Sequence, residues 1–256
     1  KGVFVKEIHE ALLAGTIDVA GHSAKDMPAV SPDGLTIAAV LPREDPRDAL
    51  VASAPSASSA FSAFPASSAF PAFAVLGTGS PRRIAQLRRL FPAARFEPIR
   101  GNVDTRLRKL DAGEVDALVL ACAGLNRLGL GGRITTPLEA ADCVPAPGQG
   151  IIAVEARRAD APALALLAGL NDAAARAALA AEQAVVAELG GGCQLPLGAF
   201  AEIHGETLSI RAVAASAAGT TVVEGSVRGD PRVPVEAGIR LARDLASRGA
   251  RELLLS

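Results

Sequence analysis

Short apolar segments alternate with amphipathic helical segments along most of this 256-residue chain. Alternation at this spacing predicts an α/β fold with layered sheets, because each helix covers the sheet formed by the strands on either side of it. The expected strands lie at 17–20, 35–40, 74–77, 95–99, 116–121 and 151–155; the expected helices lie at 3–14, 81–90 and 124–128, with one more that opens within 100–106 and ends at 112.

The segment after residue 171 has a different order of elements. A long alanine-rich helix over 172–189 is followed by three strands and then by a helix over 235–248. This order is typical of a small α+β unit. The three strands are expected at 199–203, 208–215 and 221–228.

The chain is long enough for two or three modest domains. Residues 1–42 cannot fill a domain alone, so we expect 146–168 to return to them and complete domain 1. Domain 2 is then 43–145, and domain 3 is 172–256. Residues 41–49 are interpreted as a crossover between domains. The stretch 52–73, rich in Ala, Ser, Pro and Phe, is interpreted as a surface excursion or a disordered loop within domain 2, without an assigned function.

Composition excludes several classes of protein. The formal net charge is −1, so no global field favours nucleic acid or an anionic membrane. No apolar run reaches membrane-spanning length and no signal peptide is visible, which predicts a cytoplasmic protein. The three cysteines and three histidines are widely spaced, which argues against a disulfide framework, a zinc site or any metal cluster.

Cationic side chains recur where expected strands meet expected helices. In open α/β folds, ligands bind off the carboxyl ends of strands, where helix N-termini present free backbone N–H groups. Guanidinium groups bind carboxylates and phosphates in a bidentate manner. One arginine at such a position is most simply a solvated helix residue, whereas four at corresponding positions predict a site for several anionic groups. The cations are Lys25 after a strand, Arg82 and Arg83 in the first turn of a helix capped by Ser80, and Arg100 and Arg106 around the next strand–helix turn.

Two further residues could take part in a chemical reaction. Asp26 is the only carboxylate expected among these cations; it is either an ion-pair partner or a catalytic group that stabilises a cationic intermediate and passes protons. Cys193 follows three glycines that leave room for a large group. From the residues alone, its thiol is a buried structural side chain, a nucleophile, a metal ligand or an attachment point for a prosthetic group. His22 is interpreted as a structural histidine at a strand end.

Several short motifs resemble those of the porphobilinogen deaminase family, also called hydroxymethylbilane synthase. They occur in the family's order along nearly the whole chain, and together they are highly specific. The motifs are Phe4-Val5-Lys6-Glu7, His22-Ser23-Ala24-Lys25-Asp26, Arg43-Glu44-Asp45-Pro46-Arg47-Asp48, the Arg82-Arg83 turn, the run from Arg100 to Arg106, the run from Ala123 to Gly129, the Pro147-Gly148-Gln149-Gly150 turn, and Gly191-Gly192-Cys193-Gln194.

The resemblance implies two lobes like those of type II periplasmic binding proteins, and a small C-terminal α+β domain that carries a cofactor cysteine. The family condenses four porphobilinogen molecules into hydroxymethylbilane with release of ammonia, a step of heme and chlorophyll biosynthesis. Its cofactor is a dipyrromethane held by a thioether, here to Cys193. The resemblance further implies a monomer that acts on a small molecule, without a nucleic-acid or membrane partner, in the cytoplasm, or in the plastid of a photosynthetic eukaryote.

The resemblance also assigns roles to single residues. Asp26 is the implied catalytic residue, and no metal ligand is implied. The implied cofactor-binding residues are Cys193, Ser23, Lys25, Asp26, Thr78, Ser80, Arg82, Arg83, Arg100 and Arg106. The implied substrate-binding residues are Arg127, Gln149, Lys1 and Phe4.

The chain also departs from the family pattern. The family's first segment is absent before Lys1, and the stretch 52–73 has no family counterpart. Gly21, Gly79 and Pro81 stand where other residue types are usual. Two alternatives therefore stand beside the deaminase: an inactive truncated deaminase, and a non-enzymatic anion-binding module of the periplasmic type. The second alternative gives Cys193 and Asp26 no task.

Overall fold

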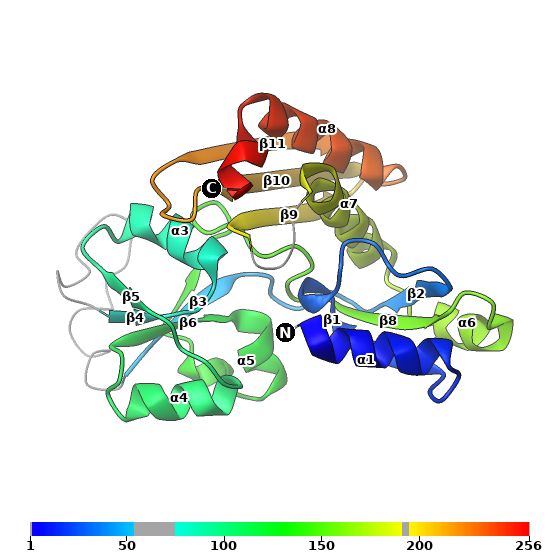
Figure 1. Cartoon of the computed structure of the whole chain (residues 1–256), viewed down its shortest axis with the longest axis horizontal. Helices are drawn as coiled ribbons and strands as arrows, with labels where there is room; N and C mark the ends of the chain where they lie inside the picture. Colours follow the sequence, from blue (N-terminus) through cyan, green and yellow to red (C-terminus); the bar gives the residue numbers. More distant parts are fainter. Residues whose placement is uncertain (1, 54–74, 191–194, 256) are drawn as a thin grey trace.

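The computed structural model describes residues 2–53, 75–190 and 195–255, with side chains from residue 5 onward. The described strands form three separate sheets, two in α/β lobes and one in a C-terminal α+β unit (Figure 1). This architecture confirms the expected fold class. Among the described residues, no single helix is long and apolar enough to span a membrane; α6 (Ala161–Ala168) and α7 (Ala173–Leu189) satisfy the criteria only jointly, with a bend of 116° between them.

The first sheet has the strand order β1-β8-β2, with both pairings antiparallel. The strands are β1 (Val19–Ser23), β2 (Leu35–Val40) and β8 (Ile152–Arg157), so the central strand comes from a distant part of the chain. Helix α1 (Gly2–Leu13) packs on this sheet through Leu12, which is fully buried. In Figure 1 this helix lies along one face of the sheet.

The second sheet has the order β5-β4-β6-β3-β7. Its strand β3 (Asp48–Ala52) is buried along its whole length because helices cover both faces. Alternate residues of β3 therefore enter two different apolar cores. Ala49 and Val51 pack in the core formed with α4 and α5, and Leu50 packs in the core formed with α3. The other elements are β4 (Val75–Gly77), α3 (Pro81–Leu90), β5 (Arg95–Glu97), α4 (Val103–Asp111), β6 (Ala117–Ala121), α5 (Cys122–Arg127), the 3₁₀ turn η2 (Gly131–Arg133) and β7 (Thr136–Leu138).

The third sheet is an antiparallel meander in the order β11-β10-β9. Helix α7 and helix α8 (Pro234–Ser247) pack on it and on each other. Gly238 allows this close approach, because a Cβ atom there would collide with the Ala181 backbone carbonyl. The strands are β9 (Leu197–His204), β10 (Thr207–Ala215) and β11 (Val222–Gly229), and the chain continues into α9 (Ala250–Leu255).

Most expected elements are confirmed, with shifts of a few residues at their ends. The interpretation of 41–49 as a crossover is wrong for its last part, because residues 48–52 form β3, a strand of the second sheet. Two prolines and several charges precede this short apolar run and hide it in the sequence. Elements β7, α6 and α9 were also missed. The interpretation of 52–73 as a loop lies outside the described residues for 54–73.

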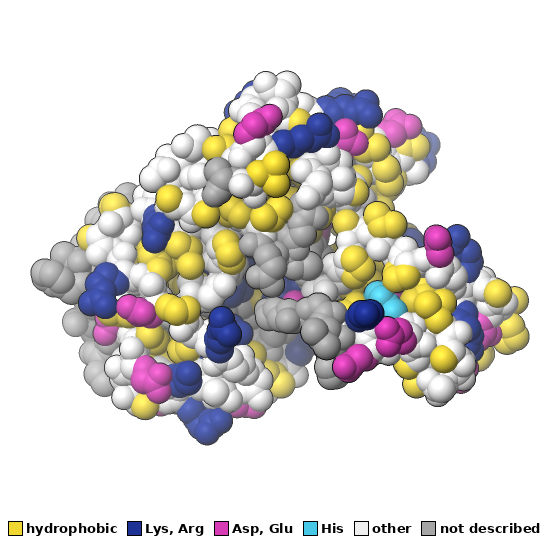
Figure 2. All heavy atoms as spheres, viewed as in Figure 1, with side chains coloured by type: hydrophobic (Ala, Val, Ile, Leu, Met, Phe, Trp, Pro, Cys, Tyr) yellow, Lys and Arg dark blue, Asp and Glu magenta, His cyan; other side chains and the backbone are white. Residues whose placement is uncertain are grey.

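The surface charge matches the nearly neutral composition. On the face drawn in Figure 2, acidic and basic side chains are interspersed with apolar ones, and neither sign forms a large continuous patch. Since the formal net charge is −1, any preference for anions must come from a local arrangement of side chains.

Candidate functional site

The centre of the site is a buried carboxylate between two arginines. Asp48, the first residue of β3, is fully buried. Arg82 donates to its Oδ2 at 2.7 Å, and Arg83 donates to its Oδ1 from Nε and Nη2 at 3.0 and 2.7 Å. Burial would raise the pKa of Asp48, but the charges and hydrogen bonds of the two guanidinium groups hold it well below its usual range. The expectation that Asp26 is the only carboxylate among the cations is therefore wrong.

Lys25 joins this cluster through Gln149. Its Nζ donates to Gln149 Oε1 at 3.2 Å, and Gln149 Nε2 donates to Asp48 Oδ1 at 2.9 Å and to the Pro46 carbonyl at 2.8 Å. Burial, together with the charge of Arg83, lowers the pKa of Lys25 to about 8, against the opposing charges of Asp48 and Asp26. A lysine so destabilised in its charged form gains from the arrival of an anion.

The turn before β8 positions Lys25. Lys25 lies in the short 3₁₀ turn η1 (Ala24–Asp26), and the backbone of Gly148 packs directly against it. Gly148 has φ of 75°, and a Cβ atom there would lie 2.9 Å from the Ala24 carbonyl carbon and 3.0 Å from the Lys25 nitrogen. Glycine is required for both the left-handed conformation and this contact.

Two helix N-termini face the same region. Ser80 caps α3 by accepting from the Arg83 backbone N–H, with Pro81 in the first helical position, as predicted. Asn102 caps α4 through the Thr105 N–H at 2.9 Å. Burial and the charge of Arg83 lower the pKa of Arg106, so the first turn of α4 brings its cation close to that of α3.

A pocket lies where the three units meet, and it encloses about 570 Å³ of empty space, its open mouth included. It combines cationic and hydroxyl groups with apolar walls. Leu195, which lines it, is two residues after Cys193 in the sequence. The lining residues are Ala24, Lys25, Met27 and Ala29 from the first unit, Ser80, Arg82, Ala146 and Pro147 from the middle of the chain, and Gln183, Val186, Leu195 and Leu197 from the last.

The structure brings together many of the predicted site residues, but not all of them. Lys25, Ser80 and Arg82 line the pocket; Arg83, Arg106 and Gln149 adjoin it through the contacts and charges above; Thr78 is buried beside Ser80, whose N–H it accepts at 3.3 Å. Ser23, Asp26 and Arg100 are exposed. Arg127 is not among the residues that line the pocket, and it donates to the Gly150 carbonyl at 2.7 Å. Lys1, the Phe4 side chain and Cys193 lie outside the described residues.

Sequence reasoning missed the carboxylates that hold the site together. Asp48 is the last residue of the Arg43–Asp48 motif and ends a run of charges immediately before an apolar segment, but the sequence alone did not identify it as a site residue. Glu182 on α7 is fully buried and accepts from Arg43 Nη1 at 2.6 Å, from the Gly148 N–H at 2.6 Å and from the Ala201 N–H at 2.8 Å. It thereby ties together the connection between the lobes, the turn before β8 and the C-terminal unit. The only signal for it in the sequence is a glutamate in the middle of an alanine-rich helix.

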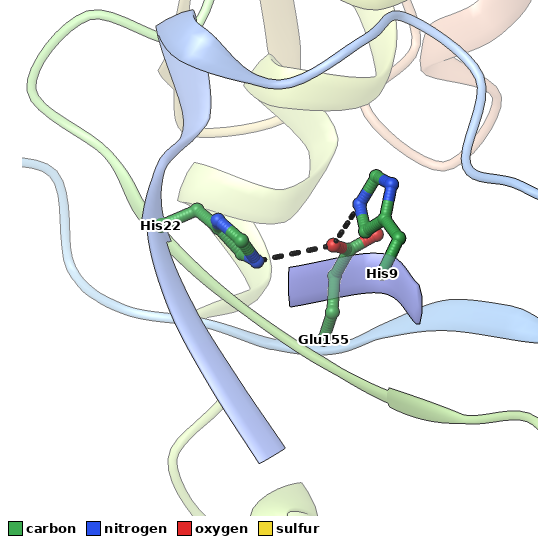
Figure 3. Close-up of side chains that lie close together, drawn as sticks. All are labelled: His9, His22 and Glu155. Carbon is green, nitrogen blue, oxygen red and sulfur yellow. Dashed lines mark hydrogen bonds and ion pairs between the residues drawn. The ribbon is translucent and has the colours of Figure 1, made fainter. Parts of the chain in front are cut away.

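A second cluster also contradicts a sequence expectation. The histidines were expected to be too scattered to meet, yet His9 and His22 both point to Glu155 (Figure 3). Burial lowers the pKa of His22, against the opposing charge of Glu155. The described cysteines, Cys122 and Cys143, are free and buried.

Comparisons with family models and with curated sequences both match porphobilinogen deaminases. The family described as "Porphobilinogen deaminase, dipyromethane cofactor binding domain" matches residues 1–165, and "Porphobilinogen deaminase, C-terminal domain" matches 177–247. The porphobilinogen deaminase of Roseiflexus sp. (strain RS-1) is 50% identical over 99% of this chain and 80% of its own length. The porphobilinogen deaminase of Nocardia farcinica (strain IFM 10152) is 46% identical over 99% of this chain and 73% of its own length. Among solved structures, the Bordetella pertussis BvgS periplasmic VFT2 domain aligns with a TM-score of 0.34 at 20% identity, over 64% of this chain and 65% of that one.

Proposed function

Because the chain belongs to the porphobilinogen deaminase family, we propose that the pocket between its three units binds the dipyrromethane cofactor and the growing pyrrole chain. The reaction condenses four porphobilinogen molecules into hydroxymethylbilane and releases ammonia. The observation that carries the proposal is the excess of cations there. Burial and the charges of Arg83 and Arg82 lower the pKa of Lys25, against the opposing charges of Asp48 and Asp26, and burial and the charge of Arg83 lower the pKa of Arg106. Such an excess favours a ligand with several carboxylates.

We divide the chain into domain 1 (1–42 and 146–168), domain 2 (43–145) and domain 3 (172–256). The pairing of β8 with β1 and β2 supports the discontinuous first domain. The five strands of the second sheet all come from 43–145, and the three strands of the third all come from 172–256. The pocket draws on all three parts of one chain, which supports action as a monomer.

The residues of the pocket fit a dipyrromethane. Pyrrole rings are flat and apolar, and the acetate and propionate groups they carry in this family are anionic. Met27, Pro147 and Val186 supply apolar wall, and Lys25 and Arg82 supply positive charge beside it. Cys193, the proposed thioether anchor, precedes the lining residue Leu195 by two positions in the sequence. When bound, the cofactor supplies the terminal pyrrole that begins the chain and keeps the product tethered.

We propose that the cations hold the carboxylates of cofactor and chain. Lys25, Arg83 and Arg106 lie around the pocket, and exposed Arg100 extends the cationic series outward. Hydroxyl groups of Ser23, Thr78 and Ser80 add hydrogen bonds to the same ligand. Fixing the carboxylates in this way orients the pyrrole carbons that must react.

Asp26 is the proposed catalytic residue. It follows Lys25 at the end of η1 and is exposed at the edge of the cationic cluster. Pyrrole attack builds positive charge on a ring nitrogen, and a carboxylate facing that N–H stabilises the charge and accepts and returns the proton.

The substrate-binding roles proposed for Lys1, Phe4, Arg127 and Gln149 differ in their support. Gln149 is buried, and its hydrogen bonds to Lys25 and Asp48 make it a positioning residue for Lys25. Arg127 is held at the Gly150 carbonyl, beside the connection between the lobes, and would reach the chain from there.

The proposal is tested by intact mass and by product. We expect the purified protein to carry the mass of a dipyrromethane on the Cys193 peptide, to turn pink with Ehrlich's reagent, and to form uroporphyrin absorbance when incubated with porphobilinogen. Cys193→Ser should abolish all three, whereas Cys122→Ser should abolish none. A Cys193→Ser protein that keeps its cofactor and turnover refutes the anchor. If the protein lacks the dipyrromethane and binds porphobilinogen without turnover, it is an anion-binding module. If it carries the dipyrromethane but shows no turnover, it is an inactive deaminase.

A further inference from the structure

His9, His22 and Glu155 form a buried cluster that the proposed reaction does not use (Figure 3). His9 comes from α1, His22 from β1 and Glu155 from β8, so three elements of the first lobe contribute one side chain each. The exposed fractions are 8%, 7% and 0%. His22 of the cluster directly precedes Ser23 in β1, and Lys25 follows in η1.

The ligand atoms of the cluster are arranged around one point. The Nε2 atoms of His9 and His22 lie 2.9 and 3.2 Å from the same carboxylate oxygen, Oε2 of Glu155. One ligand atom from each residue lies within 4.8 Å of the others. In a tetrahedral zinc site with bonds of about 2.0–2.2 Å, neighbouring ligand atoms are about 3.3–3.6 Å apart. Small rotations of the two rings would bring the three atoms to that geometry.

Hydrogen bonding leaves one of these ligand atoms without a partner. His9 Nε2 is hydrogen-bonded to Glu155, but His22 Nε2 makes no hydrogen bond, although it is fully buried. It is the only buried side-chain nitrogen or oxygen of this kind in the described parts of the chain. A buried polar atom is normally satisfied, and an imidazole nitrogen aimed at a carboxylate oxygen without a hydrogen bond is suited to a shared metal ion.

The other side of Glu155 is already fixed. Ser31 donates from Oγ to Glu155 Oε1 at 3.1 Å, which leaves Oε2 to the histidines. Such an outer hydrogen bond orients a metal-binding carboxylate. In the part of the chain that the structure describes, the ion pairs of Glu155 are with the two histidines, and no lysine or arginine neutralises it.

We propose that His9, His22 and Glu155 bind a zinc ion. The ion fixes α1 to strands β1 and β8 of the first sheet, and β1 leads directly into η1, which carries Lys25 and Asp26. Two imidazoles and one carboxylate are a frequent zinc ligand set, with a water in the fourth position. Imidazole nitrogens favour late first-row metals over magnesium or calcium, which prefer all-oxygen sites. The role of the ion is to hold α1 in place.

The test uses the full chain, stripped with EDTA and dialysed free of it, and zinc chloride as the probe. We expect one zinc per chain by competition with a chromophoric chelator, and a melting temperature that rises with zinc concentration. X-ray absorption at the zinc edge should show two imidazoles and oxygen ligands. His9→Gln should weaken zinc binding more than about tenfold and remove the rise in melting temperature.

His204→Gln is the matched control, because His204 is exposed on β9 and distant from the cluster in the fold; it should bind zinc as the parent does. The proposal is overturned if the stripped protein binds no zinc, if His9→Gln leaves affinity unchanged, or if the absorption spectrum shows sulfur ligands. If circular dichroism shows that His9→Gln does not fold, the X-ray absorption spectrum of the parent protein tests the proposal instead: two imidazoles and oxygen ligands support it, and any other ligand set overturns it.

Discussion

Arg82 donates from Nη1 to Oδ2 of Asp48 over 2.7 Å, in the interior of the middle lobe. The two residues are 34 positions apart, and their contact joins the first turn of α3 to the first residue of β3. The same Nη1 donates to the Val144 carbonyl at 2.7 Å. Asp48 is therefore the counter-charge that permits two arginines to be buried beside the pocket that we propose to bind anions.

Asp48→Asn should destabilise the protein strongly, because it leaves two buried guanidinium groups facing a neutral amide. We expect the free energy of unfolding to fall by about 3–5 kcal/mol in urea denaturation at pH 7. The folded pKa of Asp48 is held below its unfolded value, so this stabilisation is present above about pH 4 and is lost as the pH falls. The loss on mutation should accordingly shrink in acid.

The matched control is Asp230→Asn, whose partner Arg232 is 84% exposed. It should change stability by less than about 1 kcal/mol. Equal effects of the two substitutions would contradict the role given to Asp48.

Lys25 should titrate far below an ordinary lysine when no anion is bound. In Cys193→Ser, which we expect to lack the cofactor, acetic anhydride labelling followed by mass spectrometry should give Lys25 an apparent pKa of about 8. Because the folded pKa is lowered, the unfolded chain binds more protons than the folded chain between about pH 8 and 10.5. The free energy of unfolding should therefore rise with pH through that window, as the unfavourable charge on buried Lys25 is lost. Lys6, which is exposed, is the internal control.

Bound carboxylates should reverse this shift. In the cofactor-bearing protein the Lys25 pKa should rise, since an anion now faces the ammonium group. Identical titration of Lys25 in the two proteins would show that no carboxylate binds beside it.

Gly148→Ala should displace η1 and with it Lys25. Its Cβ would press on the Ala24 and Lys25 backbone, so we expect porphobilinogen turnover to fall along with stability. Gly113→Ala is the matched control, because Gly113 has φ of 76° but open space around the added Cβ. The control should show only the conformational cost of the left-handed region, about 1–2 kcal/mol, with turnover retained. Equal loss of turnover in both would argue against the contact.

Local signals in the sequence predicted much of the fold. The helix at 81–90 has the expected bounds, and its start was predictable because Ser80 and Pro81 are N-terminal signals that depend only on neighbouring residues. Strand β3 was missed because its pairing partners, β6 and β7, lie far along the chain, and its short apolar run follows prolines and charges. Burial on both faces is set by helices that the local sequence does not reveal.

The candidate site was predicted in part for the same reason. The cations were recognised from their positions after strands, which is a local pattern. Their counter-charges were not, since Asp48 meets Arg83 across 35 positions and Glu182 meets Arg43 across 139. The meeting of His9 with Glu155 spans 146 positions. Such contacts follow from topology, so spacing along the chain gave no indication of them.

Glu182→Gln should loosen the contacts among the three units. The carboxylate accepts two backbone N–H groups and the Arg43 guanidinium, and Arg43 also stacks 4.8 Å from the Phe200 ring centroid. Removing the charge leaves Arg43 without its partner, at an expected cost of about 3–5 kcal/mol by urea denaturation. Glu188→Gln, on the same helix but partly exposed, should cost less than about 1 kcal/mol. A smaller loss for Glu182 than for Glu188 would refute this role.

Asp26→Asn should separate cofactor attachment from chain growth. The amide keeps the size of the side chain but cannot take a proton or oppose positive charge, so turnover of porphobilinogen should fall about 10²–10⁴-fold. The mass on Cys193 should remain, because attachment depends on the thiol and the cations. Asp33→Asn, an exposed aspartate before β2, should leave both turnover and mass unchanged. Near-normal turnover of Asp26→Asn would assign the proton transfer to another group, and a missing mass would place Asp26 in cofactor assembly instead.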